Sequence, residues 1–133
     1  MRTHVETISV RYAETDRMGV AHHSNYLLWF EIGRTGLLRE SGHTYRELES
    51  SGILLPVVEY GARFMKGADY DDVLAIETTV REIKSRVVTF DYRVRRDGEV
   101  IAEGFTRHVC ADGELKTRRF PDQLVAAMAP FLP

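Results

Sequence analysis

The sequence predicts one α+β domain, in which a single long central helix is wrapped by an antiparallel sheet of five or six strands. The chain has 133 residues, the size of one ordinary domain, and 44% of them are apolar. Apolar residues recur at helical spacing in the first third of the chain and in strand-like runs afterwards. Asp-Gly pairs at 97–98 and 112–113 are typical of tight turns between antiparallel strands. We therefore expect residues 1–133 to form one domain.

The first third of the chain is expected to form a strand, a loop and the central helix. The strand is expected over 4–12 and the loop over 13–19. The helix is expected over 24–39, where apolar residues fill most of the helical circumference. Gly33 and Gly36 lie inside this segment, and each lowers helix propensity by about 1 kcal/mol relative to alanine. We expect the sheet to approach the helix backbone closely at these two glycines.

The rest of the chain is expected to form mainly strands. A short polar helix is expected over 44–51, strands over 54–66, 72–83, 86–96, 99–110 and 114–119, and a last helix over 121–129. In the strand over 86–96, apolar and polar residues alternate, so one face packs against the helix and the other face is polar. The polar face of the sheet, with Thr79, Thr89 and Thr106, is expected to be wet or covered by another subunit.

The composition excludes several classes of protein. The chain has 18 Lys and Arg against 20 Asp and Glu, so it lacks the positive field of a non-specific nucleic-acid binder. The single cysteine, Cys110, can form neither an intrachain disulfide nor a zinc cluster, which favours a reducing compartment. No stretch approaches the roughly 20 apolar residues of a membrane helix, and the N-terminus lacks a signal-peptide core. We expect a cytoplasmic protein with no metal site, no nucleic-acid partner and no membrane span.

Groups suited to acyl chemistry gather just before the expected start of the long helix. In chain order they are Tyr12, Glu14, Asp16, His22 and His23. Unpaired backbone N–H groups at a helix N-terminus, together with the helix dipole, stabilise a carboxylate or a developing oxyanion. A carboxylate held beside them can attack a carbonyl carbon or activate a water molecule, while the N–H groups polarise the carbonyl oxygen.

Each of these residues also has a purely structural interpretation. Asp16 can simply stabilise the turn before the helix, and His23 can be a hydrogen-bonded residue at the helix start. Tyr12 ends the first expected strand and can belong to the core. Glu14 and His22 are expected to be solvated rather than functional.

The same segment carries a family resemblance. Its first motif consists of Tyr12, Glu14-Thr15-Asp16, Gly19-Val20, His23, Asn25-Tyr26, Trp29, Glu31 and Arg34. Residues 69–78, and 104–109 through 120–121, continue the pattern, so the likeness covers nearly the whole chain. With these motifs the sequence resembles the 4-hydroxybenzoyl-CoA thioesterase family of hotdog-fold acyl-CoA thioesterases, including its Tol-Pal-associated subgroup. The resemblance implies a hotdog fold, in which an antiparallel sheet wraps one helix.

The resemblance also implies a reaction and roles for individual residues. The family's catalytic carboxylate falls on Asp16, and its accompanying tyrosine and histidine fall on Tyr12 and His23. The N–H groups near His23 and Ser24 would polarise the thioester carbonyl of an acyl-CoA substrate. Whether Asp16 acts as a nucleophile, through a mixed anhydride, or as a general base for water stays open. No cofactor is implied, because coenzyme A is part of the substrate.

Assembly and substrate binding are implied in the same way. Family members form dimers that pair their sheets, dimers commonly associate into tetramers, and each site lies between two subunits. A partner's strand would line the acyl pocket with Val58, Glu59, Tyr60 and Gly61. By position, Lys84, Arg86 and Arg118 resemble the regions that contact the coenzyme A phosphates, although solvated strand-end charges explain them as well.

Two other functions stay open at this point. One is a hotdog hydratase or dehydratase acting on an acyl-CoA or an acyl carrier protein. The other is a non-catalytic acyl-CoA-binding module, because a fold alone does not establish an activity.

The sequence departs from the family in two places. His23 is atypical of the branch that acts on aromatic acyl groups, and residues 65–68 lack a proline. The length and type of the acyl group therefore stay open.

Overall fold

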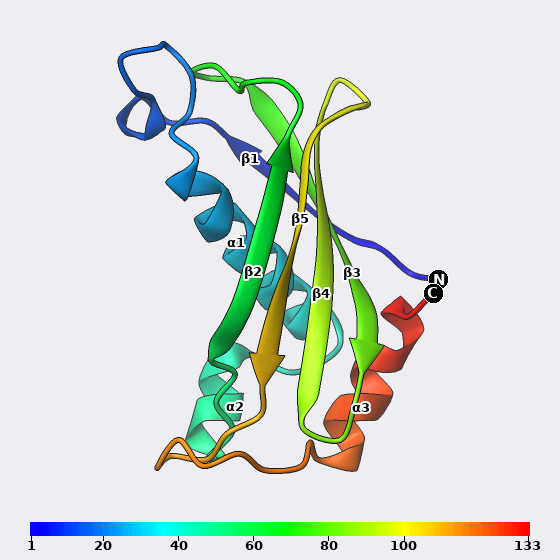
Figure 1. Cartoon of the computed structure of the whole chain (residues 1–133). Helices are drawn as coiled ribbons and strands as arrows, with labels where there is room; N and C mark the ends of the chain where they lie inside the picture. The colour runs from blue at the N-terminus through cyan, green and yellow to red at the C-terminus, as the bar shows by residue number, and fades with distance from the viewer.

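The fold is built on one antiparallel sheet with the strand order β1-β3-β4-β5-β2, described here from a computed structural model of residues 1–133. Helix α1 lies across one face of this sheet (Figure 1). The elements, in chain order, are β1 (His4–Ser9), the 3₁₀ turn η1 (Tyr12–Glu14), α1 (Ser24–Glu40), α2 (Tyr45–Ser50), β2 (Val57–Phe64), β3 (Val73–Ile83), β4 (Val87–Arg96), β5 (Glu99–Val109), α3 (Asp122–Met128) and the 3₁₀ turn η2 (Ala129–Phe131). No helix combines the length and the hydropathy of a membrane-spanning segment.

Helix α1 packs closely on the sheet, as its two glycines predict. A Cβ atom on Gly33 would lie 2.3 Å from Thr78 Oγ1, and a Cβ atom on Gly36 would lie 2.4 Å from His4 Nε2. The expected close approach is thus confirmed at both positions. The largest buried side chains of the helix belong to Trp29 and Phe30, and the ring of Phe30 is stacked on that of Tyr92, with 4.4 Å between the ring centroids.

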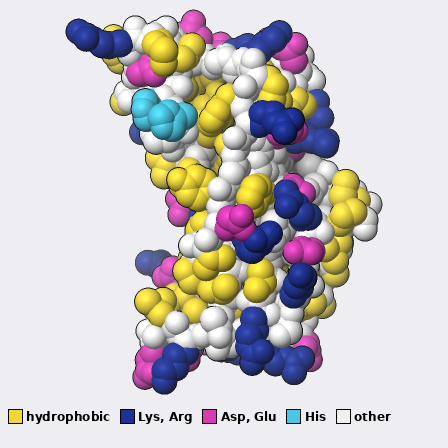
Figure 2. All heavy atoms as spheres, viewed as in Figure 1, with side chains coloured by type: hydrophobic (Ala, Val, Ile, Leu, Met, Phe, Trp, Pro, Cys, Tyr) yellow, Lys and Arg dark blue, Asp and Glu magenta, His cyan; other side chains and the backbone are white.

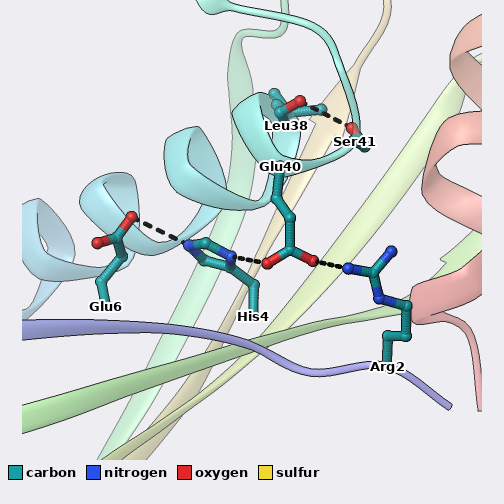
Figure 3. Close-up of polar contacts among 6 residues, drawn as sticks. All are labelled: Arg2, His4, Glu6, Leu38, Glu40 and Ser41. Atoms are coloured by element: carbon teal, nitrogen blue, oxygen red, sulfur yellow. Dashed lines mark hydrogen bonds and ion pairs between the residues drawn. The ribbon is translucent and has the colours of Figure 1, made fainter.

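A network of polar side chains joins β1 to the last turn of α1 (Figure 3). His4 Nδ1 lies 2.9 Å from Glu40 Oε1, and His4 Nε2 lies 3.0 Å from Glu6 Oε1. Arg2 Nη2 donates to Glu40 Oε2 at 2.5 Å. Because Glu40 is at the negative end of the helix dipole, a neighbouring cation offsets an otherwise unfavourable position for a carboxylate. The contacts of these residues therefore hold the edge strand β1 against the helix.

The two ends of the chain lie side by side (Figure 1). The backbone N–H of Arg2 donates to Pro130 O at 2.8 Å, and the Arg2 guanidinium lies 5.1 Å from the centroid of the Phe131 ring. Leu124 and Met128 of α3 are buried. The expected C-terminal helix is confirmed, and its buried side chains belong to the hydrophobic core.

The order of elements predicted from the sequence is confirmed with three corrections. The first strand ends at Ser9, and Tyr12 belongs to a 3₁₀ turn instead of closing the strand. The segment 114–119 forms no strand, because Leu115 has φ +62° and only an isolated bridge joins Ala111 to Thr117, so the sheet has five strands. Thr106 points toward α1 and not to the far face, since its hydroxyl contacts buried Tyr92 at 2.6 Å, and Thr89 is fully buried within the single chain instead of being wet or covered by another subunit.

Strand β2 is an edge strand and leaves much apolar surface exposed. It pairs with β5 on one side and has no neighbour on the other. Tyr60 is 60% exposed, and Val58 and Phe64 are also exposed. Figure 2 shows apolar side chains, among charged ones, on this face of the molecule. An exposed, unpaired apolar edge is typical of a strand that another chain covers.

Candidate active site

A cavity of about 230 Å³ lies at the N-terminal end of α1. It is lined by Asp16, Met18, Val20, Ala21, His23, Tyr26, Phe64, Met65, Lys66 and Gly67. The cavity thus brings Asp16 and His23 together, beside an apolar wall in which the rings of Tyr26 and Phe64 meet edge to face at 4.8 Å. The histidine side chains visible in Figure 2 lie at this end of the molecule.

A tight turn holds the Asp16 carboxylate. The Asp16 N–H donates to Val20 O at 2.9 Å, and the Gly19 N–H donates to Asp16 O at 3.0 Å. Asp16 Oδ1 accepts from the Met18 N–H at 2.8 Å, whereas Oδ2 accepts no hydrogen bond. The turn requires Gly19, whose φ of +82° favours glycine. One carboxylate oxygen therefore stabilises the turn, and the other is available to a substrate or a water molecule.

A backbone donor at the start of α1 has no partner. The Asn25 N–H donates to His22 O at 3.0 Å, and the Tyr26 N–H donates to His23 O at 3.2 Å. The Ser24 N–H lies 3.2 Å from His22 Nδ1, which also contacts the Ser24 hydroxyl at 2.9 Å. The backbone N–H of His23 has no hydrogen-bond partner. The free N–H at the helix start is therefore that of His23, a residue that lines the cavity.

The other two side chains proposed for chemistry differ in their surroundings. The His23 ring is exposed and packs on the His22 ring, with 4.1 Å between centroids. Tyr12 is 77% exposed and meets Tyr70 edge to face at 5.6 Å. Tyr12 does not line the cavity. A single chain therefore brings Asp16 and His23 together and leaves Tyr12 outside.

The residues expected to line a partner's acyl pocket lie along β2, away from the cavity. Val58 and Tyr60 are exposed, and Glu59 forms an ion pair with Arg107 of β5. Gly61 instead lines a groove of about 640 Å³ on the far face of the sheet. None of these four residues reaches Asp16 within one chain.

The basic residues expected to contact phosphates form one group at the other end of the sheet. Arg86 O accepts from the Cys110 N–H at 2.8 Å, and Cys110 O accepts from the Arg118 N–H at 2.9 Å. Lys84 lies in the adjoining turn between β3 and β4. This turn and the start of α1 are at opposite ends of the sheet (Figure 1). A strand of ten residues such as β4 spans roughly 30 Å, so within one chain these basic residues are remote from Asp16.

Glu14 is not solvated, contrary to the expectation from the sequence. It is 6% exposed, and its Oε1 accepts from the Arg11 N–H at 2.7 Å. Its Oε2 accepts from the indole N–H of Trp29 at 3.1 Å. Burial raises the pKa of Glu14, but the hydrogen bonds from Arg11 and Trp29 outweigh burial and hold the pKa below its ordinary value. The spacing of Arg11 and Glu14, three residues apart around a short turn, is the sequence signal for this contact.

One helix across a five-stranded antiparallel sheet, with a carboxylate and a free N–H at the helix start, defines an α+β protein of the hotdog class. The chain belongs to the thioesterase-like superfamily, which it matches over residues 10–128. This match includes the whole cavity lining described above.

Individual relatives agree with this assignment. The chain is 34% identical to the putative acyl-CoA thioesterase YneP of Bacillus subtilis, over 86% of this chain and 83% of the relative. It is 41% identical, with a TM-score of 0.92, to the crystal structure of the hypothetical protein TT1821 from Thermus thermophilus, over 96% of this chain and 98% of that chain. It is 28% identical, with a TM-score of 0.92, to a DHNA-CoA thioesterase from Staphylococcus aureus, over 98% and 91% of the two chains. None of these names specifies the 4-hydroxybenzoyl-CoA branch or the Tol-Pal-associated subgroup, so membership of either stays a prediction.

Proposed function

We propose that this chain hydrolyses an acyl-CoA thioester to a free acid and coenzyme A. The observation that carries the proposal is that Asp16, whose Oδ2 accepts no hydrogen bond, and His23, whose backbone N–H has no partner, line the same cavity. Membership of the thioesterase-like superfamily and the relative named as an acyl-CoA thioesterase support it. The apolar wall of Tyr26 and Phe64 suits an acyl group.

In the proposed reaction, the thioester carbonyl oxygen accepts a hydrogen bond from the His23 N–H and is further stabilised by the dipole of α1. Asp16 Oδ2 then acts in one of two ways. It attacks the carbonyl carbon, expels the coenzyme A thiolate and forms a mixed anhydride that water hydrolyses, or it takes a proton from a water molecule that attacks directly. In both cases the C–S bond breaks, water supplies the hydroxyl of the acid, and the thiolate takes up a proton. The His23 ring is proposed to protonate the leaving thiolate, and Tyr12 to orient the substrate.

We further propose that the working unit is a dimer paired through the β2 edge. Antiparallel pairing of β2 with its copy reverses the direction of the second chain. The partner's basic group, with Lys84, Arg86 and Arg118, would then lie at the same end as the Asp16 of the first chain. This arrangement would bring Val58, Glu59, Tyr60 and Gly61 of the partner toward the acyl group, and it supplies positive charge for the phosphates of coenzyme A. A further association into tetramers, and a cytoplasmic location, stay predictions.

Substitution of Asp16 tests the proposed reaction. Asp16→Asn keeps the shape and removes the charge, and we expect turnover to fall by roughly 10²-fold or more. Asp71→Asn is the matched control, because Asp71 is exposed and its φ of 67° is one that asparagine also tolerates. Thiol release from a panel of aliphatic and aromatic acyl-CoA substrates measures the activity.

Each alternative predicts a different result from the same panel. Near-full turnover by Asp16→Asn would remove Asp16 from the chemistry. Tight binding of acyl-CoA with no thiol release by the unsubstituted protein would identify a binding module. Hydration of enoyl-CoA in place of thioester cleavage would identify a hydratase.

A further inference from the structure

One residue joins the turn that carries Asp16 to the start of α1. The backbone carbonyl of Glu14 accepts from the His22 N–H at 2.8 Å and from Asn25 Nδ2 at 2.9 Å. Its carboxylate accepts from the indole N–H of Trp29, one turn further along the helix, at 3.1 Å. The backbone carbonyl of Glu14 therefore binds the segment before the helix and its first turn, and the side chain binds the second turn.

The surroundings of the Glu14 carboxylate leave it little freedom. Trp29 is fully buried, and Glu14 is nearly so. The other carboxylate oxygen, Oε1, accepts from the backbone N–H of Arg11, and the exposed Arg11 guanidinium lies 3.5 Å from Oε2, the oxygen that accepts from Trp29. A buried carboxylate is stable only when its oxygens are hydrogen-bonded, so this side chain has one favourable position.

Glu14 does not itself line the cavity, but its neighbours in the chain do. Asp16 follows two residues later, and Thr15 forms an isolated bridge with Ala21, which lines the cavity. His22, which the Glu14 carbonyl holds, directly precedes His23. A shift of Glu14 therefore changes the separation between the Asp16 carboxylate and the His23 N–H without removing a substrate contact.

We infer that Glu14 is a positioning residue, which sets the Asp16 carboxylate against the His23 N–H through its contacts with Trp29, His22 and Asn25. The inference rests on the proposed function of the same cavity. A misplacement of about 1 Å of a catalytic group can lower a rate by about 10²-fold. Loss of the Glu14 contacts should therefore lower kcat and leave KM nearly unchanged.

Three variants separate the contacts of the Glu14 carboxylate from those of the Glu14 backbone carbonyl. Glu14→Ala removes both carboxylate bonds. Glu14→Gln has one acceptor oxygen, so it satisfies either the Trp29 or the Arg11 donor and turns an N–H₂ group toward the other. Asn25→Ala removes the side-chain donor to the Glu14 and His22 carbonyls, at a partly buried position, and leaves both carboxylate bonds in place. Glu114→Gln is the matched control, since the Glu114 side chain is 79% exposed in a loop at the far end of the sheet.

We expect kcat to fall by about 10-fold in Glu14→Gln and about 100-fold in Glu14→Ala, with a smaller fall in Asn25→Ala and none in Glu114→Gln. KM should stay within about twofold throughout, because no substrate contact is removed. The chain contains one tryptophan, so its intrinsic fluorescence reports the Glu14 contact directly. The Trp29 emission maximum should shift in both Glu14 variants and stay unchanged in Asn25→Ala and Glu114→Gln.

Thermal unfolding shows which variants are folded under the assay conditions. Should Glu14→Ala fail to fold, Glu14→Gln and Asn25→Ala still decide the question. Wild-type kcat in a folded Glu14→Gln whose Trp29 emission has shifted would overturn the inference, as would a loss of kcat that only follows the folded fraction. Asp16→Asn is measured alongside: if that variant retains turnover, the proposed chemistry fails, whereas an inactive Asp16→Asn beside a fully active Glu14→Gln rejects the role of Glu14 alone.

Discussion

Acidification from pH 7 to pH 4 is expected to lower the free energy of unfolding by about 3 kcal/mol through one side chain, that of His108. His108 lies on β5 and is fully buried. Its Nδ1 lies 2.9 Å from Leu55 O, and its Nε2 lies 2.7 Å from Thr106 Oγ1. Because a carbonyl oxygen only accepts, Nδ1 carries the proton and Nε2 accepts from the Thr106 hydroxyl. The neutral ring is thus fully hydrogen-bonded.

The magnitude follows from the pKa of this ring. Burial lowers the pKa of His108 from 6.5 to about 4, the positive charge of Arg34 acts in the same direction, and the hydrogen bond to Leu55 O partly opposes both. As the pH falls below 6.5, the unfolded chain binds a proton that the folded chain does not, so stability is lost. Each pH unit of this window costs about 1.4 kcal/mol, which gives about 3 kcal/mol at pH 4 and almost no effect above pH 7.

Urea unfolding at pH 7 and pH 4 measures the loss, and His108→Gln identifies its source. The carboxyl groups of Glu14 and Asp72 also have lowered pKa values, so they add to the acid sensitivity of every variant. His43→Gln serves as the control, because His43 is partly exposed and its side chain forms no hydrogen bond. His108→Gln should be less stable than the control at pH 7 but lose about 3 kcal/mol less on acidification. An equal acid loss in the two variants would refute the assignment to His108.

Two further substitutions test the packing. Gly33→Ala places a methyl group 2.3 Å from Thr78 Oγ1. Although alanine has the better helix propensity, this substitution should lower the free energy of unfolding, measured with urea, by about 1–3 kcal/mol. In the control Gly113→Ala the new methyl group meets no atom within 4 Å, so stability should change little. Tyr92→Phe removes the hydroxyl that contacts Thr106 Oγ1 at 2.6 Å and should cost about 1–2 kcal/mol, so an unchanged melting temperature would contradict the buried hydrogen-bonded chain.

The elements with a local signal are those that the sequence predicts well. The turn between β4 and β5 needs positive φ at both central residues, and Asp97 and Gly98 have φ values of 51° and 82°. The central helix follows from apolar spacing, and its bounds differ from the prediction by one residue. Such features depend on residues within a few positions of each other, so the sequence shows them directly.

The prediction of a strand over 114–119 was wrong because of local side-chain hydrogen bonds. Asp112 Oδ1 accepts from the N–H groups of both Glu114 and Lys116, at 2.9 and 3.0 Å. The side chain thereby takes donors that a strand would offer to a neighbour. The turn signal of Asp112-Gly113 predicted a further strand after it, and the side-chain hydrogen bonds of Asp112 prevent that strand.

Glu14 explains the early end of the first strand in the same way. Its carboxylate accepts the Arg11 N–H, which removes that donor from the sheet and closes a 3₁₀ turn that contains Tyr12. The second half of the contact, to Trp29, joins residues 15 apart and depends on how α1 packs against the turn. Sequence spacing suggests the first half of this contact, whereas the second half requires the fold.

In the candidate site, too, some features follow from the local sequence and others require the fold. Asp16 and His23 are seven residues apart in one turn that leads into one helix, so the local sequence is enough to predict that they share a cavity. The basic residues Lys84, Arg86 and Arg118 come from two later segments and meet at the opposite end of the sheet. Their distance from Asp16 is set by strand length, which no short motif encodes. If these basic residues bind the phosphates of a substrate whose carbonyl lies at Asp16, as proposed, the two groups come from different chains, and the exposed β2 edge is the surface proposed to join those chains.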